Sequence, residues 1–205
     1  MRASKQRTEI RQEQIAQATL DIIAEQGMPA LSVAAVAQRV GIVPSGLYRH
    51  YRDKEALIDA ALDAIASRHT AGLKAADQPP NRDAVDRLER LFIDHLEMIT
   101  ASVAIPRIVF SRDIHAGHHG RRAKLLKIVN GFLDHIAAII VQGQREGCLR
   151  RDMEPAAAAR LFFGLIQPAA FLWNLSDGMM DVKTQAKAAW PLFLRATKAE
   201  KGTTR

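Results

Sequence analysis

The chain has 205 residues, 48% hydrophobic and 25% charged, values that exclude collagen-like, low-complexity and membrane-spanning classes of protein. A single cysteine, Cys148, excludes an internal disulfide framework and a cysteine-rich zinc site. The formal net charge of +7 suits a polyanionic partner, yet residues 1–60 carry eight Lys or Arg against seven Asp or Glu, and residues 61–205 carry 21 against 15.

No targeting or membrane segment is predicted. Residues 1–14 are charged throughout and lack an apolar stretch followed by a small-residue cleavage site, so we expect a cytoplasmic protein. The longest uncharged apolar run, residues 161–176, is shorter than the roughly 18 residues that a membrane span needs, and it contains Gln167, Pro168 and Asn174. We interpret it as a buried helix and expect no membrane partner.

Apolar residues recur at helical spacing in nearly every segment and no run alternates with period two, which predicts an all-α fold. A first helix ends at Gly27, a residue that tolerates the left-handed cap conformation. Ser32 is the predicted N-cap of a short second helix that stops at Gly41. Pro44 begins a third short helix, and Asp53 caps a fourth that runs to about Ala76.

The C-terminal part is predicted to contain longer helices. Residues 77–81 form a Pro-containing linker. Apolar residues at three- and four-residue spacings predict amphipathic helices over residues 85–99 and 125–147. Between them we expect a shorter helix at 105–115 and a break at 117–120. Two more helices are predicted at 154–176 and at 181 to about 198.

The second and third short helices, with a glycine-containing turn between them, form a helix-turn-helix arrangement, which places its second helix in the DNA major groove. The predicted recognition helix is 44–50. Its Arg49 can make a bidentate contact to guanine, and Gly46 lets the backbone approach closely. Ser32, Tyr48 and Lys54 are expected to contact phosphates. A disordered N-terminal arm that carries Arg2, Lys5 and Arg7 is expected to add further contacts. The residues expected to contact DNA are Ser32, Pro44, Ser45, Gly46, Tyr48, Arg49, His50 and Lys54. Leu47 and Tyr51 are expected in the core.

Residues 15–58 resemble the TetR-type repressors. The resemblance rests on the sequence AEQG at 24–27, on Ser32-Val33 and Val36-Ala37, on GIVPSGLYRHY at 41–51, and on KEAL at 54–57. One departure is Val43, which stands where the family often has a small polar cap. The recognition helix is therefore expected to lack a side-chain N-cap.

The resemblance implies a homodimeric repressor of a palindromic double-stranded DNA operator. Residues 1–52 would form the helix-turn-helix DNA-binding domain, and residues 53–205 a helical domain that binds a small, largely apolar effector and dimerises through the last two helices. The effector would release DNA only to the extent that it binds the DNA-free conformation of the protein more tightly than the DNA-bound one. The expected ligand-binding residues are Phe92, Leu96, Phe110, Phe132, Phe163, Gln167 and Trp173, although the apolar ones also fit an ordinary core. No cofactor is expected.

Three alternatives remain. One is an architectural or division-regulating DNA-binding protein without an inducer. Another is a metal sensor, because imidazole suits zinc, nickel and copper, and the candidates are His95, His115, His118, His119 and His135. Their spacing repeats no known ligand motif, so no metal site is predicted. The third is an enzyme, but the sequence has no phosphate-binding Gly-rich loop and no nucleophile elbow, and Cys148 has no basic neighbour. We therefore expect no catalytic residues.

Overall fold

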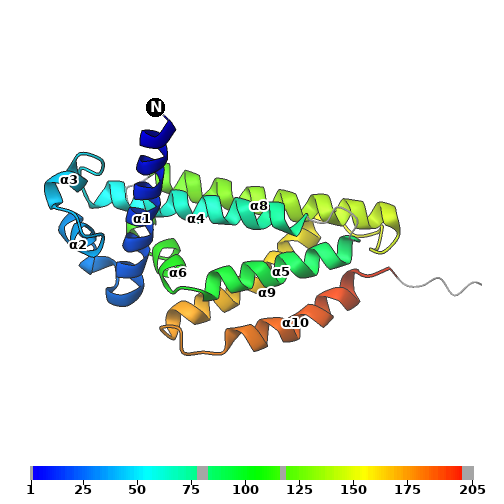
Figure 1. Cartoon of the computed structure of the whole chain (residues 1–205). Coiled ribbons are helices and arrows are strands. Elements are labelled where there is room, and N and C mark those ends of the chain that lie inside the picture. The colour runs from blue at the N-terminus through cyan, green and yellow to red at the C-terminus, as the bar shows by residue number, and fades with distance from the viewer. Residues whose placement is uncertain (1, 78–82, 116–118, 200–205) are drawn as a thin grey trace, which may run out of the picture. The chain divides into compact units, whose positions relative to one another are not determined.

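The computed structural model describes residues 2–77, 83–115 and 119–199, and every regular element within these ranges is a helix (Figure 1). This confirms the predicted all-α fold. The chain divides into two compact units, one formed by residues 1–68 and 102–125 and the other by residues 69–101 and 126–205. The predicted head at 1–52 thus belongs to a unit that also contains a segment from the middle of the chain.

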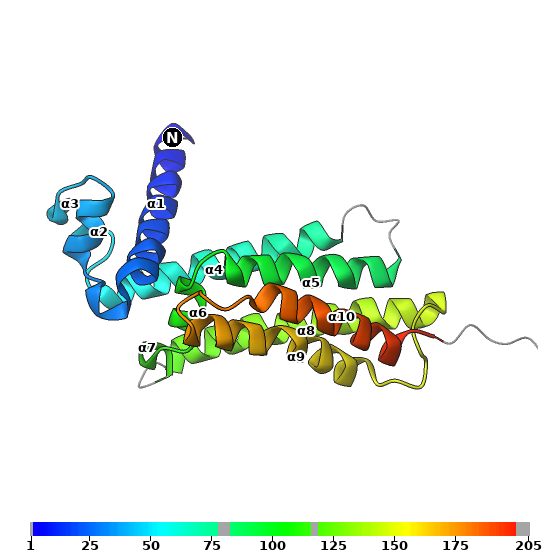
Figure 2. The ribbon, with the colours of Figure 1, turned by 90° about the horizontal axis from the view of Figure 1, so that it is seen from below.

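The first unit begins with α1 (Arg2–Gln26) and a 3-10 turn, η1 (Met28–Ala30). It continues with α2 (Val33–Arg39), α3 (Pro44–Tyr48) and the first part of α4 (Lys54–Ala76). The middle of the chain contributes α6 (Ala104–Val109), α7 (Arg112–His115) and the start of α8 (His119–Glu146). In Figures 1 and 2, α2 and α3 lie next to α1.

The expectation of a disordered N-terminal arm is wrong, because α1 begins at Arg2. Residues 2–26 contain neither Gly nor Pro and are rich in Glu, Gln, Arg and Ala, which favour helix. Polarity alone predicted disorder, whereas helix propensity decided the outcome. The side chains of residues 1–8, and with them Arg2, Lys5 and Arg7, lie outside the described part of the structure.

Local signals fix the ends of the short helices as predicted. Gly27 ends α1 at φ 80°, and its N–H donates to the carbonyl of Ile23 at 3.0 Å. The Ser32 hydroxyl oxygen accepts from the N–H of Ala35 at 3.1 Å, and Asp53 Oδ1 accepts from the N–H of Ala56 at 2.9 Å. Val43 precedes α3 without a side-chain cap. Each of these four expectations is confirmed.

The second unit contains α5 (Ala84–Thr100), α9 (Pro155–Leu175) and α10 (Val182–Thr197), with the remainders of α4 and α8. Figure 2 shows α5, α9 and α10 side by side. Aromatic rings join these helices in the core: the ring centroids are 5.4 Å apart for Phe92 and Trp190, and 5.6 Å for Phe162 and Phe193. The carboxylates of Glu154 and Asp181 cap α9 and α10. Each of these helices therefore begins one residue after the predicted start and ends one residue before the predicted end.

By length and composition alone, α8 and α9 are apolar enough to cross a membrane. Core helices of soluble proteins pass the same test. Both helices contribute fully buried side chains to the core of the second unit, including Phe132 and Ile136 from α8 and Phe162 and Ile166 from α9. We therefore interpret both as core helices.

A glycine on α8 sets how closely the second unit packs. A Cβ at Gly143 would lie 2.6 Å from Leu149 Cδ1 and 2.8 Å from the Cβ of Ala84, distances that the neighbours cannot accept without moving. Gly143→Ala is expected to lower the free energy of unfolding by about 1–3 kcal/mol through overpacking, measured by urea denaturation.

The matched control is Gly131→Ala on the same helix, because nothing lies within 4 Å of a Cβ added there. Relief of the helix penalty of glycine should raise stability by up to about 1 kcal/mol. Equal effects of the two substitutions would contradict the packing argument.

Candidate DNA-binding surface

The turn between α2 and α3 is closed by backbone hydrogen bonds. Gly41 adopts φ 68°, and the N–H of Ile42 returns to the carbonyl of Ala37 at 3.0 Å. The α3 helix ends at Tyr48 rather than at the predicted His50. The N–H of His50 bonds to the carbonyl of Leu47, three residues back, which tightens the chain into a turn as it leads to the buried Tyr51.

Helix α3 separates an inward apolar side from an outward polar side. Leu47 is fully buried and the ring of Tyr51 is 9% exposed, so both are core residues as predicted. Tyr48 is 53% exposed. The structure also places at the surface, wholly or in part, the remaining predicted contacts: Ser32, Pro44, Ser45, Gly46, Arg49, His50 and Lys54. Tyr48 at the end of α3, and Arg49 and His50 just after it, therefore place hydroxyl, guanidinium and imidazole groups at the surface.

Two predicted phosphate contacts already have partners inside the protein. Lys54 Nζ donates to the carbonyl of Met28 at 2.7 Å, which fastens the start of α4 to η1. An ammonium group has three protons, so two are left for another acceptor. The Ser32 hydroxyl accepts the cap bond and keeps its own proton to donate. Both groups are held in place and retain donor capacity.

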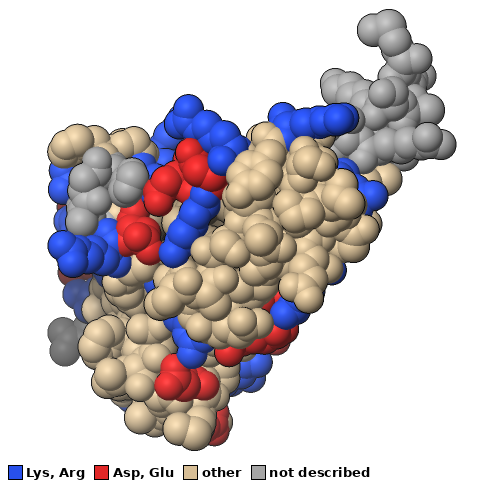
Figure 3. All heavy atoms as spheres, turned by 90° about the vertical axis from the view of Figure 1, so that its left-hand side faces the viewer, with Lys and Arg blue, Asp and Glu red and all other residues tan. Residues whose placement is uncertain are grey.

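The surface around α2 and α3 carries little unpaired charge. Arg39 pairs with Glu25 and lowers the pKa of that carboxyl through a hydrogen bond, and Arg52 pairs with Asp53 at 3.0 Å. Arg49 makes no ion pair within the described residues. Viewed from the side of α3, the middle of the surface is mostly uncharged (Figure 3). Arg49 is thus an exposed cation without an ion-pair partner among the described residues.

Two arginines from the middle of the chain hold the head in place. Arg107 on α6 donates to the carbonyls of Ile23 at 3.0 Å and Ala24 at 2.7 Å, which lie in the last turn of α1. Arg121 at the start of α8 is 5% exposed and donates to Asp59 Oδ1 and to the carbonyl of Glu55, both at 2.7 Å, and to the Glu55 carboxylate.

Burial is the largest single influence on the pKa of Arg121 and lowers it, but hydrogen bonds to Asp59 and Glu55 and their charges raise it overall. Sequence reasoning missed both arginines as structural contacts of the head. No local pattern marks them, because their partners lie 62 to 84 residues away.

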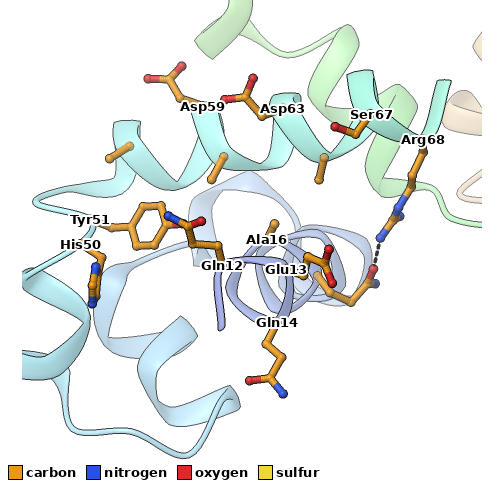
Figure 4. Close-up of a pocket in the computed structure, with 14 residues that line it drawn as sticks. Gln12, Glu13, Gln14, Ala16, His50, Tyr51, Asp59, Asp63, Ser67 and Arg68 are labelled. Atoms are coloured by element: carbon orange, nitrogen blue, oxygen red, sulfur yellow. Dashed lines mark hydrogen bonds between the residues drawn. The ribbon is translucent and has the colours of Figure 1, made fainter. Parts of the chain in front are cut away.

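A groove of about 890 Å³ lies between α1 and α4 in the same unit (Figure 4). His50 and Tyr51 line one end, and Arg68 bonds to Gln17 across the other. Its other walls are polar residues of α1 and small residues of α4, including Ala56, Ala60 and Ala64. The carboxylates of Asp59 and Asp63 point away from α1 (Figure 4). This groove was not predicted from the sequence.

The expected effector-binding residues divide between the two units. Phe92, Leu96 and Phe132 are buried in the second unit, where Phe163, Gln167 and Trp173 are partly buried. Phe110 is 42% exposed and belongs to the first unit, whereas the other six expected residues belong to the second. The indole Nε1 of Trp173 is buried and has no acceptor among the described residues.

A pair of histidines lies beside this cluster. The ring of His95 stacks on Phe132 with centroids 4.4 Å apart and meets the ring of His69 edge-on at 5.2 Å. Burial, assisted by His69, lowers the pKa of His95 to about 3, and burial also lowers the pKa of His69. His69 was not singled out, although the spacing of Leu62, Ile65 and His69 marks one buried face of α4.

The histidines considered for a metal are spread over different surroundings. His95 is partly buried against Phe132, His135 Nε2 lies 3.4 Å from Asp77 Oδ1, and His119 is exposed. The side chains of His115 and His118 lie outside the described residues. Among the side chains that are described, no three of His, Cys, Asp or Glu gather as metal ligands would.

Comparison with known proteins assigns both parts of the chain. Residues 15–61 match the family "Bacterial regulatory proteins, tetR family", and residues 73–196 match "YsiA-like protein, C-terminal region". A fatty acid metabolism regulator protein of Bacillus subtilis is 20% identical over 88% of this chain and 92% of its own length. A nucleoid occlusion factor of Marinobacter nauticus is 28% identical over 73% of this chain and 74% of its own.

The structure of the transcriptional regulator FadR from Bacillus subtilis, in complex with stearoyl-CoA, aligns with a TM-score of 0.72. The alignment covers 89% of this chain and 97% of that chain at 18% identity. It therefore supports the fold.

The buried histidine pair predicts that stability falls in acid. Because the pKa of His95 is about 3 in the folded chain and near 6.5 when unfolded, the unfolded state binds more protons between these pH values. The free energy of unfolding should fall from pH 7 to pH 5 by up to about 1.4 kcal/mol per pH unit for each such histidine. Urea denaturation at pH 7, 6 and 5 measures the slope.

His95→Phe keeps the ring stack and should reduce this pH dependence, whereas His119→Gln, at an exposed histidine, should leave it unchanged. The account is wrong if the slope is the same in wild type and His95→Phe.

Proposed function

Because the chain belongs to the TetR family of bacterial regulatory proteins, we propose that it is a homodimeric repressor of a palindromic operator, released by a small, largely apolar effector. Members of this family are DNA-binding transcriptional regulators. The observation that carries the proposal is the outward polar face of α3, opposite the buried Leu47 and Tyr51. The protein is expected in the cytoplasm, without membrane partner, cofactor or catalytic residues.

Each predicted contact has a role in this proposal. Arg49 reads a base edge, because it is exposed and makes no ion pair within the described residues. Tyr48, Ser32 and Lys54 bind phosphates with their remaining donors. Pro44, Ser45, Gly46 and His50 complete the surface that enters the groove.

The effector site is proposed within the second unit. Phe92, Leu96, Phe132 and Phe163 supply apolar contacts, and Gln167 and the unpartnered Nε1 of Trp173 supply polar ones. The solved relative bound to stearoyl-CoA supports an effector with a long apolar part. Phe110 is exposed in the other unit and is the least supported of the predicted ligand contacts.

The last two helices supply the proposed dimer contact. The exposed positions of α9 that recur every three or four residues form one apolar face: Leu161, Gly164, Pro168, Phe171 and Leu175. On α10, the large apolar side chain of Leu192 is 57% exposed. Trp190 and Phe193, on the other side of α10, are buried in the core of their own unit. Two copies of such a helix pair suit a four-helix contact.

A division-regulating DNA-binding protein is the second candidate function, because a nucleoid occlusion factor is among the relatives. The two candidates differ in the response to effector. A repressor released by an apolar effector loses operator affinity when stearoyl-CoA or a comparable apolar probe is added. The alternative predicts affinity that no such probe changes.

Arg49→Ala is expected to relax the base preference at one position of each half-site by about 1–3 kcal/mol. Tyr48→Phe removes an uncharged phosphate donor and should weaken binding to all sequences, with little change in the slope of log affinity against log salt. The operator is first selected from a random duplex pool with the wild-type protein. Titration of each variant against this operator and its single-base variants then measures the base preference and the overall affinity. Equal weakening of every duplex by Arg49→Ala would assign Arg49 to a phosphate instead.

Leu161→Glu combined with Leu175→Glu should produce a monomer, because the charges fall on two exposed positions of the apolar face. Light scattering measures the mass and circular dichroism the retained helix. Glu89→Lys with Glu97→Lys, at exposed positions of α5, provides a charge-changing control outside the proposed contact that should stay dimeric. A double leucine variant that remains dimeric would place the interface elsewhere.

A further inference from the structure

The positive charge of the DNA-binding unit comes mainly from outside the helix-turn-helix. Residues 1–68 contain nine Lys or Arg against eight Asp or Glu, a net charge of +1. Residues 102–125, which belong to the same compact unit, contain five Lys or Arg against one Asp, a net charge of +4. Duplex DNA binding depends strongly on neutralising phosphates, so the location of this charge matters for affinity.

The buried Arg121 brings this segment to the start of α4. It bonds to both the carbonyl and the carboxylate of Glu55, the residue next to the proposed phosphate contact Lys54. Its Nη1 also lies 3.4 Å from the carbonyl of Asp113, so the first turn of α7 contacts the same guanidinium. Residues 112–113 and 121–122 are thereby held beside the first turn of α4.

Internal ion pairs leave two of the segment's cations uncompensated. Arg121 pairs with Glu55 and Asp59, and Lys124 pairs with Asp63, so three carboxylates on one side of α4 are neutralised. Arg112 and Arg122 are exposed, and neither forms an ion pair with a described residue. Figure 3 shows Lys and Arg side chains at the edge of the surface whose middle is uncharged.

We propose that Arg112 and Arg122 bind DNA phosphates that flank the half-site read by α3. The inference rests on the proposed function and extends its DNA-binding surface to α7 and the start of α8. The two guanidinium groups add affinity without sequence information, because phosphates are the same at every base pair. The mostly uncharged surface around α2 and α3, together with Arg49, then reads the bases, while Arg112 and Arg122 at its margin supply much of the electrostatic attraction.

The test compares the wild type with Arg112→Gln combined with Arg122→Gln on two duplexes. One ends at the last base pair of the selected operator, and the other extends about one helical turn, roughly ten base pairs, on each side. The control, Lys74→Gln with Arg145→Gln, removes two exposed cations of the other unit. Affinity is measured at several salt concentrations, and thermal unfolding checks that each variant folds.

On the long duplex, the Arg112/Arg122 variant should lose roughly tenfold in affinity, and its salt slope should fall by about 0.9 for each lost phosphate contact. On the short duplex the affinity of the Arg112/Arg122 variant should equal that of the wild type. The control variant should have wild-type affinity on both duplexes. Wild-type affinity on the long duplex, or equal losses on both duplexes or in the control, would overturn the proposal. If the wild type selects no operator, the proposed function fails instead, which is a separate result.

Discussion

The DNA-binding unit depends on one buried charge, the guanidinium of Arg121. At 5% exposure it has lost most of its water, so its pairing with Asp59 and Glu55 and its bonds to two carbonyls have to compensate for desolvation. Removing one partner of such a buried group typically costs about 3–5 kcal/mol. Arg107 adds a second attachment by capping the end of α1. Together they make residues 102–125 part of the unit that contains the helix-turn-helix.

This arrangement gives the proposed regulation a physical route. Helices α4 and α8 each begin in the DNA-binding unit and continue without interruption into the second unit. An effector that favours one arrangement of α5, α8 and α9 around Phe92 and Phe132 therefore acts on helices that Arg121 joins to each other. The effector can weaken DNA binding only by the difference in its affinity for the two arrangements.

Local chemistry made the head predictable. Gly27, Ser32, Gly41, Pro44 and Asp53 each act within a few residues, and the structure confirms the ends of helices that they mark. What failed depended on distant partners or on competing tendencies. The helix from Arg2 was missed because polarity suggested disorder. The contacts of Arg107 and Arg121 join segments far apart in sequence, so spacing along the chain carries no sign of them.

The central claim, a sequence-specific dimeric regulator, is tested most directly by selecting binding sites for the wild-type protein from a random duplex pool at near-physiological salt. The number of chains in each retained complex is determined in the same experiment. The account predicts an enriched palindrome with half-sites about one helical turn apart, or a multiple of it, bound by two chains or by four as paired dimers. Retention without an enriched sequence, falling steeply with salt, would contradict it.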